Sequence, residues 1–254
     1  MSPFQLTNQV AVVTGGSRGI GKAAVAWLAR LGANVVVNFV SDEQAAMSTV
    51  ELAKHEGVQA ISVRADVAKL AEAELLIKAT LDRFKRIDIL VCNAGIWQGA
   101  PAEEISEDLW DKTLEINLKG TWTVCRAAIP FMKRQHAGRI VIVSSTAGQR
   151  GEANVSNYAA SKGGQISFTK SLSTELAPFG ITVNCVAPGW VDTELNSDVF
   201  ADGDRLRSIV DGIPVGRVAT ADDIALPIAF LCSEAARHIT GEVLNVNGGS
   251  VLCG

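Results

Sequence analysis

Short runs of apolar residues alternate with helix-length amphipathic segments along the whole chain of 254 residues. Several of the runs are continuous stretches of Val, Ile and Leu, as expected for parallel strands covered on both faces. Parallel neighbours need right-handed crossovers between them, so the alternation predicts a doubly wound α/β sheet. The predicted strands are Val10–Thr14, Asn34–Phe39, Gln59–Arg64, Ile87–Cys92, Arg139–Ser144, Thr182–Val186 and Val243–Val246.

Helical patterns fill the segments between these strands. They cover Ile20–Leu31, Glu43–His55, Ala71–Phe84, Glu107–Arg134 and Asn157–Pro178. Gly32, Gly57 and Gly180 follow three of them, where a left-handed cap is favoured. We therefore expect one domain over residues 1–254, a Rossmann-like sheet of about seven parallel strands with helices on both faces. Residues 190–217 form an irregular stretch that we interpret as a substrate lid.

Composition excludes several classes of protein. A net charge of −4 argues against a nucleic-acid surface, which needs a basic face. The chain has no apolar run near the ~20 residues that span a bilayer and no signal-peptide pattern at its start, so we expect a cytoplasmic protein with no membrane contact. Five scattered cysteines (Cys92, Cys125, Cys185, Cys232 and Cys253) lack the spacing of a disulfide framework or a zinc site, and we predict no metal. Cys92 and Cys185 fit best as small buried hydrophobes.

A glycine-rich segment follows the first strand and opens the first helix. It reads Gly15, Gly16, Ser17, Arg18, Gly19, Ile20, Gly21. Glycines allow a sharp turn and close approach of a pyrophosphate, and the helix N-terminus adds partial positive charge. The formal G-x-G-x-x-A from Gly19 to Ala24 begins too late to be the turn itself. The position between strand and helix predicts a dinucleotide site.

The end of the second strand bears on the choice of cofactor. A site for NAD usually places a carboxylate there for the ribose 2′-hydroxyl, whereas this chain has Asn38. Arg18, in the phosphate loop, offers a guanidinium to a 2′-phosphate. Together these residues predict NADP(H). Asp42 would reverse the preference if the register were shifted by a turn.

The most informative residues for chemistry are Tyr158 and Lys162, four positions apart and hence on one face of a helix. A phenol exchanges protons poorly at neutral pH, and a neighbouring ammonium is expected to lower its pKa. Tyr158 is the only tyrosine of the chain. This spacing alone is of low specificity.

Taken with the other motifs, the pair resembles the short-chain dehydrogenase/reductase family. The glycine segment, Asn93-Ala94-Gly95, Asn117, Ser145, Tyr158 with Lys162, and Pro188-Gly189 follow that family's order and spacing over essentially the whole chain. Within the family, NCVAPGWVDTEL, IPVGR and ITGEVLNVNGG are most similar to the 3-oxoacyl-(acyl-carrier-protein) reductases of fatty acid biosynthesis.

The resemblance implies four catalytic residues. Tyr158 would deliver a proton to the carbonyl oxygen as hydride arrives from the nicotinamide, and Ser145 would polarise that oxygen. Ser145, thirteen residues before Tyr158, fits this role better than Ser144. Lys162 would hold the ribose hydroxyls and tune the phenol. Asn117 would hold a water of the proton relay, or else only satisfy backbone groups in a bent helix.

The resemblance also implies contacts to the cofactor and the substrate. Asp66 and Val67 would lie beside the adenine, Asn93, Ala94 and Gly95 beside the adenosine, and Pro188, Gly189, Val191 and Thr193 around the nicotinamide. The expected pocket walls include Trp97, Gln149 and Trp190. Glu152, if it faces the pocket, would disfavour an anionic substrate there.

Partners follow from the same resemblance. A small carbonyl compound or an acyl thioester is the expected substrate, with acyl carrier protein as its possible donor and a homotetramer as the assembly. Carrier-protein reductases use arginines at the mouth of the site, where this chain has Phe179 and His136, with Lys133, Arg134 and Arg139 as substitutes. This departure keeps a free ketone or a sugar open as substrate.

Two other classes of function remain alternatives. One is a nucleotide-binding regulator without turnover, which has no need for the set Asn117, Ser145, Tyr158 and Lys162. The other is a methyltransferase on a related sheet, which would make no use of the Tyr–Lys pair.

Overall fold

Seven parallel strands form the central sheet of the computed structural model, which describes residues 2–252. Their order, β3-β2-β1-β4-β5-β6-β7, reverses between β1 and β4, so the sheet is doubly wound as predicted. The strands are β1 (Val10–Val13), β2 (Asn34–Phe39), β3 (Ala60–Arg64), β4 (Ile89–Cys92), β5 (Gly138–Val143), β6 (Ile181–Pro188) and β7 (Val243–Val246).

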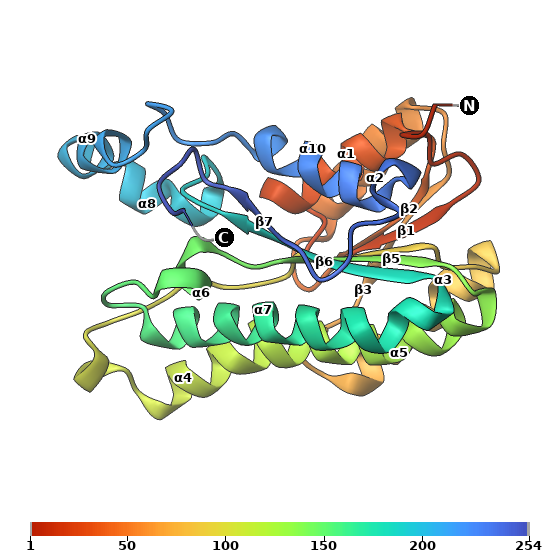
Figure 1. Cartoon of the computed structure of the whole chain (residues 1–254), viewed down its shortest axis with the longest axis horizontal. Helices are drawn as coiled ribbons and strands as arrows, with labels where there is room; N and C mark the ends of the chain where they lie inside the picture. The colour runs from red at the N-terminus through yellow and green to blue at the C-terminus, as the bar shows by residue number, and fades with distance from the viewer. Residues whose placement is uncertain (1, 253–254) are drawn as a thin grey trace.

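Helices cover both faces of this sheet and bury two separate apolar cores (Figure 1). One layer holds α1 (Gly19–Arg30), α2 (Glu43–His55) and α10 (Ala221–Cys232). The other holds α3 (Leu70–Phe84), α5 (Gly120–Gln135) and α7 (Ser156–Leu176). Helix α10 was not among the sequence predictions, although Thr220 and Asp223 form a capping box at its start.

The glycines predicted to end helices do adopt left-handed backbone. Gly32, Gly57 and Gly180 have φ of 96°, 83° and 69°, respectively. This region is unfavourable for residues with a Cβ, so these positions stop the helices where the pattern predicts.

The helix predicted over Glu107–Arg134 contains an irregular turn. It begins as α4 (Glu107–Leu114), widens into a π turn, η2 (Glu115–Lys119), and continues as α5. In this turn the Gly120 N–H donates to the Glu115 carbonyl, five residues earlier. Such π turns are frequent at functional sites, and this one contains Asn117.

Residues 190–217, expected to be irregular, are largely helical, and that expectation is corrected. They contain η4 (Glu194–Asn196), α8 (Ser197–Phe200) and α9 (Gly203–Asp211). The two ends of the segment are joined, because Asp192 N donates to Ala219 O at 2.8 Å and Ala219 N to Trp190 O at 3.0 Å. The segment therefore leaves and rejoins the domain at one place.

The remaining elements are short: η1 (Ala102–Glu104), α6 (Thr146–Arg150), η3 (Ala177–Phe179) and η5 (Glu234–Ala236). Cys92 and Cys185 are buried in β4 and β6, as predicted, and Cys253 lies outside the described residues. Within residues 2–252, no helix has the length and apolar character needed to cross a membrane.

Candidate functional site

The glycine-rich turn after β1 brings the backbone at Gly21, in the first turn of α1, close to the backbone at Gly15. Gly15 and Gly19 have φ of 61° and 52°. A Cβ at Gly21 would lie only 2.2 Å from the Gly15 carbonyl oxygen, so the helix packs on the turn with no room for a side chain. Gly19 is the first residue of α1, which places the G-x-G-x-x-A match inside the helix, as expected.

The N-terminus of α1 is chemically suited to an anion. Its N-cap residue, Arg18, makes no side-chain cap, and the first turn carries no acidic residue. The amides of this turn are therefore available to a phosphate, and the helix dipole favours one there. Arg18 is exposed beside them and has no ion-pair partner among the described residues. The predicted residues Ser17 and Ile20 flank it. This cradle fits the pyrophosphate of a dinucleotide.

Asn38 is buried, with its side chain turned into the protein. Its amide nitrogen donates to Ala65 O at 2.9 Å and to Val63 O at 3.3 Å, and its oxygen accepts from Gly15 N at 3.4 Å. The side chain thus ties β2 and β3 to the glycine turn. Asn38 can therefore affect the choice between NAD and NADP only by leaving the end of β2 without a carboxylate.

Asp42 does not take the place of that carboxylate. It is the N-cap of α2, where its side chain accepts from Ala45 N at 2.9 Å. The register of β2 is the predicted one, with Asn38 opposite Val63. A shifted register, which would have put Asp42 in the place of the carboxylate and favoured NAD, is therefore excluded.

Asn93 and Ala94 are held against the glycine turn by Thr14, which the sequence prediction missed. The Thr14 hydroxyl accepts from Asn93 N at 2.9 Å and from Ala94 N at 3.0 Å. The Asn93 amide donates to the Thr14 and Gly15 carbonyls, both at 3.1 Å. A threonine at the end of the first strand, next to the glycines, was the available signal.

Asp66 and Val67 follow β3 at the same edge of the sheet. The Asp66 carboxylate accepts from Ala68 N at 3.1 Å, which caps the turn, and it is only partly buried. Val67 is buried, and its carbonyl accepts from the Thr123 hydroxyl. Their contact with an adenine stays a prediction.

Asn117 joins two segments of the site from within the π turn. Its side chain accepts from Ile96 N at 2.8 Å and donates to Ile96 O at 3.0 Å and to Ser161 Oγ at 3.0 Å. Ser161 in turn donates to the Tyr158 carbonyl at 2.7 Å. Asn117 thus satisfies backbone groups, and the water predicted for it remains untested. A Cβ at Gly95 would lie 3.1 Å from the Asn117 oxygen, so the loop packs tightly here.

Ser145 and Tyr158 meet at the carboxyl end of β5. The Ser145 side chain hydrogen-bonds the phenol, and burial, the larger effect, raises the pKa of Tyr158 to about 12. The expectation that Lys162 lowers this pKa is therefore wrong for the protein alone. The phenol is protonated at neutral pH, the form that can donate a proton.

Lys162 lies one turn after Tyr158 on the same face of α7, as predicted. Its Nζ is 5.6 Å from the centre of the Tyr158 ring and donates to the Val143 carbonyl at 2.8 Å. Burial lowers its pKa to about 8. The neighbouring Ser144 points inward and donates to the Lys162 carbonyl at 2.8 Å, which agrees with the choice of Ser145 for the chemistry.

The segment after β6 approaches the first glycine turn. Pro188 ends β6, and a Cβ at Gly189 would lie 3.1 Å from the Asn247 backbone. Val191 is buried, and the Thr193 methyl lies 3.4 Å from where a Gly19 Cβ would be. The structure thus brings Thr193 to the start of α1, on the side of the predicted phosphate site.

Three aromatic rings link this segment to the loop after β4. Trp97 and Trp190 meet edge to face with 6.0 Å between ring centres, and Trp190 and Phe200 are also 6.0 Å apart. Phe200 is the last residue of α8 and was not among the predicted walls. Gln149 donates to Asn245 Oδ1 at 2.6 Å. The rings thus attach the helical segment 190–217 to the loop beside α7.

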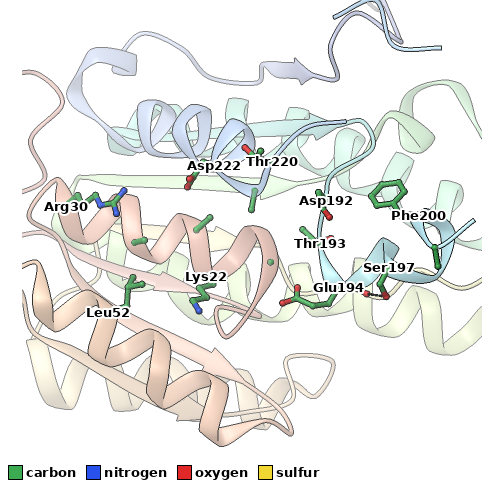
Figure 2. A pocket seen from close by; sticks show the side chains of 15 residues that line it. Lys22, Arg30, Leu52, Asp192, Thr193, Glu194, Ser197, Phe200, Thr220 and Asp222 are labelled. Carbon is green, nitrogen blue, oxygen red and sulfur yellow. Dashed lines mark hydrogen bonds between the residues drawn. The ribbon is translucent and has the colours of Figure 1, made fainter. Parts of the chain in front are cut away.

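A groove of about 820 Å³ opens between α1, the segment after β6 and the start of α10 (Figure 2). Lys22 and Arg30 of α1, Glu194 and Phe200 line it together with Asp222 of α10. It includes Gly19 and Thr193 of the predicted cofactor residues, whereas Ser145, Tyr158 and Lys162 do not line it. The groove therefore borders the phosphate cradle and is separate from the Tyr–Lys pair.

Phe179 and His136 do not lie at the mouth of this chain's own site, and that expectation is corrected. Phe179 follows the C-terminal end of α7, a helix of 21 residues that begins beside Tyr158. At 1.5 Å per residue, about 30 Å separates the two ends. The Lys133 ammonium lies 4.5 Å above the Phe179 ring, and Arg139 pairs with Glu234. A basic group near Phe179 is therefore too far from Tyr158 to contact the reaction centre of the same chain.

Comparison with known proteins shows which proteins this chain is similar to. The family model described as enoyl-(acyl carrier protein) reductase matches residues 15–250. The 3-oxoacyl-[acyl-carrier-protein] reductase of Synechocystis sp. is 42% identical over 97% of this chain and 98% of its own length. That of Staphylococcus aureus strain N315 is 40% identical over 95% and 98%.

Two solved structures are similar over nearly their whole length. Levodione reductase has a TM-score of 0.93 at 30% identity, covering 96% of this chain and 98% of its own. A candidate NAD(P)-dependent gluconate 5-dehydrogenase of Beutenbergia cavernae, solved with bound NADP at low occupancy, has a TM-score of 0.93 at 38% identity, covering 98% and 99%.

A doubly wound sheet with this turn and this Tyr–Lys pair defines a nucleotide-dependent oxidoreductase. The chain belongs to the short-chain dehydrogenase/reductase family, because the family model and the relatives named above match it over nearly all of its length.

Proposed function

We propose that the chain is an NADP(H)-dependent reductase that converts a ketone to a secondary alcohol, with 3-oxoacyl thioesters as its substrate class. The observation that carries the proposal is the contact of Ser145 with a protonated Tyr158, with the Lys162 ammonium 5.6 Å from the phenol ring. The names of its relatives from Synechocystis and Staphylococcus support the substrate class.

The chemistry that bound NADPH would supply here is a hydride for the carbonyl carbon of the substrate. The chain's own residues manage the charge that then develops on the carbonyl oxygen. Ser145 donates a hydrogen bond to that oxygen, and the Tyr158 hydroxyl transfers its proton to it, so the product leaves as a neutral alcohol. Preplaced donors of this kind stabilise the transition state because they need no reorganisation.

Binding of the cofactor is assigned to the cradle described above. Gly15, Gly19 and the amides that begin α1 would hold the pyrophosphate, and Arg18 the 2′-phosphate. The Lys162 Nζ donates to Val143 O and lies close to the Tyr158 ring. From this position it would hold a ribose hydroxyl and also influence the phenol. The bound NADP of the Beutenbergia structure supports the same cofactor here.

The assembly proposed is a homotetramer in which α4, α5 and α7 pair between copies. Trp110 and Trp122 of this face are 39% and 42% exposed. A groove of about 620 Å³, lined by Leu114, Leu118 and Trp122, crosses it. A second copy would cover this surface, and that copy could bring Lys133 near a partner's site for an acyl carrier protein. A monomer in light scattering at micromolar concentration would contradict the proposal.

A second candidate is reduction of a free cyclic ketone or a sugar. Phe179 stands where a carrier-docking arginine is expected, and Trp97 and Trp190 make an apolar wall of two rings that meet edge to face. The name of the similar levodione reductase supports this candidate.

The test measures NADPH and NADH consumption with acetoacetyl-CoA, cyclohexanone and 5-ketogluconate. We expect NADPH-selective turnover that is fastest with the thioester, and loss of the NADPH preference in Arg18→Ala. Turnover with the free ketones alone would favour the second candidate. Cofactor binding without turnover on any of them would favour a regulator.

A further inference from the structure

Gln165 is a fully buried amide in the middle of α7 that contacts the π turn. Its Nε2 donates to the Asn117 carbonyl at 2.8 Å and to Thr121 Oγ1 at 2.7 Å. The Thr121 hydroxyl donates to the same carbonyl at 2.8 Å. Two side chains from two helices therefore converge on one main-chain oxygen.

That oxygen belongs to Asn117, a residue that connects the loop after β4 to α7. A π turn interrupts the regular ladder of helix hydrogen bonds, so side chains must satisfy the backbone groups it displaces. The conformation of the turn determines where the Asn117 side chain points, and this side chain holds Ile96 on one side and Ser161 on the other. Whatever fixes the Asn117 carbonyl also fixes these contacts.

Packing alone does not explain an amide at this position. Gln165 Oε1 is buried and has no hydrogen-bond partner within residues 2–252. A buried acceptor without a partner destabilises a fold, and a leucine of similar size would avoid it. The two hydrogen bonds donated by Nε2 are what the amide contributes and a leucine lacks.

We propose that Gln165 is a positioning residue for the reaction, acting through Asn117. It holds the π turn in the conformation that keeps the Asn117 amide between the loop at Ile96 and the turn of α7 that bears Tyr158. Within residues 2–252, the Gln165 side chain makes no hydrogen bond to Ser145, Tyr158 or Lys162. The inference rests on the proposed function, because its effect is measured as turnover.

The first test compares Gln165→Leu with Thr169→Val. Thr169 is the buried residue one turn further along the same face of α7, and its hydroxyl donates to the Gln165 carbonyl at 2.9 Å. Within residues 2–252, this hydroxyl makes no hydrogen bond to the π turn. We expect Gln165→Leu to lower kcat roughly 10- to 100-fold while the KM for NADPH and the Tm stay close to wild type. Thr169→Val should keep the wild-type kcat.

The second test uses Gln165→Glu, which has the same shape but donates to the Asn117 carbonyl only when protonated. Its kcat should therefore rise as pH falls, on a profile that the wild type lacks. This signature decides the matter even if the leucine variant fails to fold, provided that circular dichroism shows Gln165→Glu folded across the profile. In a protein that stays folded, a purely structural role gives no such dependence of kcat on pH.

The outcomes separate the two proposals. A wild-type enzyme without turnover refutes the proposed function. A working wild type refutes the role of Gln165 if the leucine variant keeps kcat, if Thr169→Val loses as much, or if the glutamate variant follows the wild-type profile.

Discussion

The Lys162 ammonium donates a 2.8 Å hydrogen bond to the Val143 carbonyl at the end of β5. This bond holds a charged group in a buried position, and burial lowers its pKa from 10.5 to about 8. In the unfolded chain the pKa returns to its ordinary value. Below pH 8 the folded protein therefore carries a destabilising charge worth about 3 kcal/mol.

Lys162→Met should consequently raise the free energy of unfolding at pH 7, by up to about 3 kcal/mol, while abolishing reduction. As pH rises from 8 to 10.5, the folded wild type loses this penalty, so the advantage of the variant should shrink. Urea unfolding at pH 7 and pH 10 measures both. Lys170→Met, an exposed lysine of the same helix, should show no such difference, and a variant that is less stable at pH 7 would contradict the account.

Gly21→Ala should abolish cofactor binding. The added Cβ would lie 2.2 Å from the Gly15 carbonyl oxygen, so α1 must move away from the glycine turn. We expect no measurable quenching of tryptophan fluorescence by NADPH and a lower Tm. Gly203→Ala is the control, because nothing lies within 4 Å of a Cβ there. Wild-type affinity for NADPH in Gly21→Ala would show that the cradle lies elsewhere.

Trp190→Ala should weaken binding of the substrate but not of the cofactor. Its ring stands between Trp97 and Phe200, so its loss opens the wall and releases α8. The expected rise in KM for the carbonyl substrate is roughly 10- to 100-fold, with Trp190→Phe near wild type. Steady-state kinetics with each substrate varied in turn provide the measurement. An unchanged KM would mean that the aromatic residues only attach the segment 190–217.

The two directions of the reaction should differ in their dependence on pH. Reduction needs the protonated phenol and oxidation needs the phenolate, and burial holds the pKa of Tyr158 at about 12 in the protein alone. Alcohol oxidation should therefore speed up with rising pH across 7–9, while reduction stays nearly level. Initial rates in both directions test this. An oxidation rate that does not change with pH would mean that the bound cofactor lowers the phenol's pKa below 7.

Much of this architecture could be predicted because it depends on local patterns. Apolar runs and the glycines at positions 32, 57 and 180 fixed the strands and the helix ends, and the four-residue spacing placed Lys162 beside Tyr158. The family's order of motifs then identified Ser145, which the structure places in contact with the phenol.

Most of the failures have their cause in tertiary context. From the sequence, the Asn38 side chain is expected to be available at the end of a strand. In the structure its amide donates hydrogen bonds to the carbonyl groups of Ala65 and Val63. The phenol was expected to be acidified by its neighbour, whereas burial has the larger effect. The π turn at Asn117 depends on packing that no local pattern encodes. Helix α9 had a local signal that the prediction did not use, because the Asp202 side chain caps its start.

The most direct test of the central claim is the rate of NADPH oxidation with acetoacetyl-CoA in wild type and Tyr158→Phe. Removing only the hydroxyl should leave NADPH affinity unchanged and lower kcat roughly 10²- to 10⁴-fold, because the oxygen that develops charge loses its proton donor. Turnover in Tyr158→Phe close to that of the wild type would contradict the role of Tyr158 and with it the proposed mechanism.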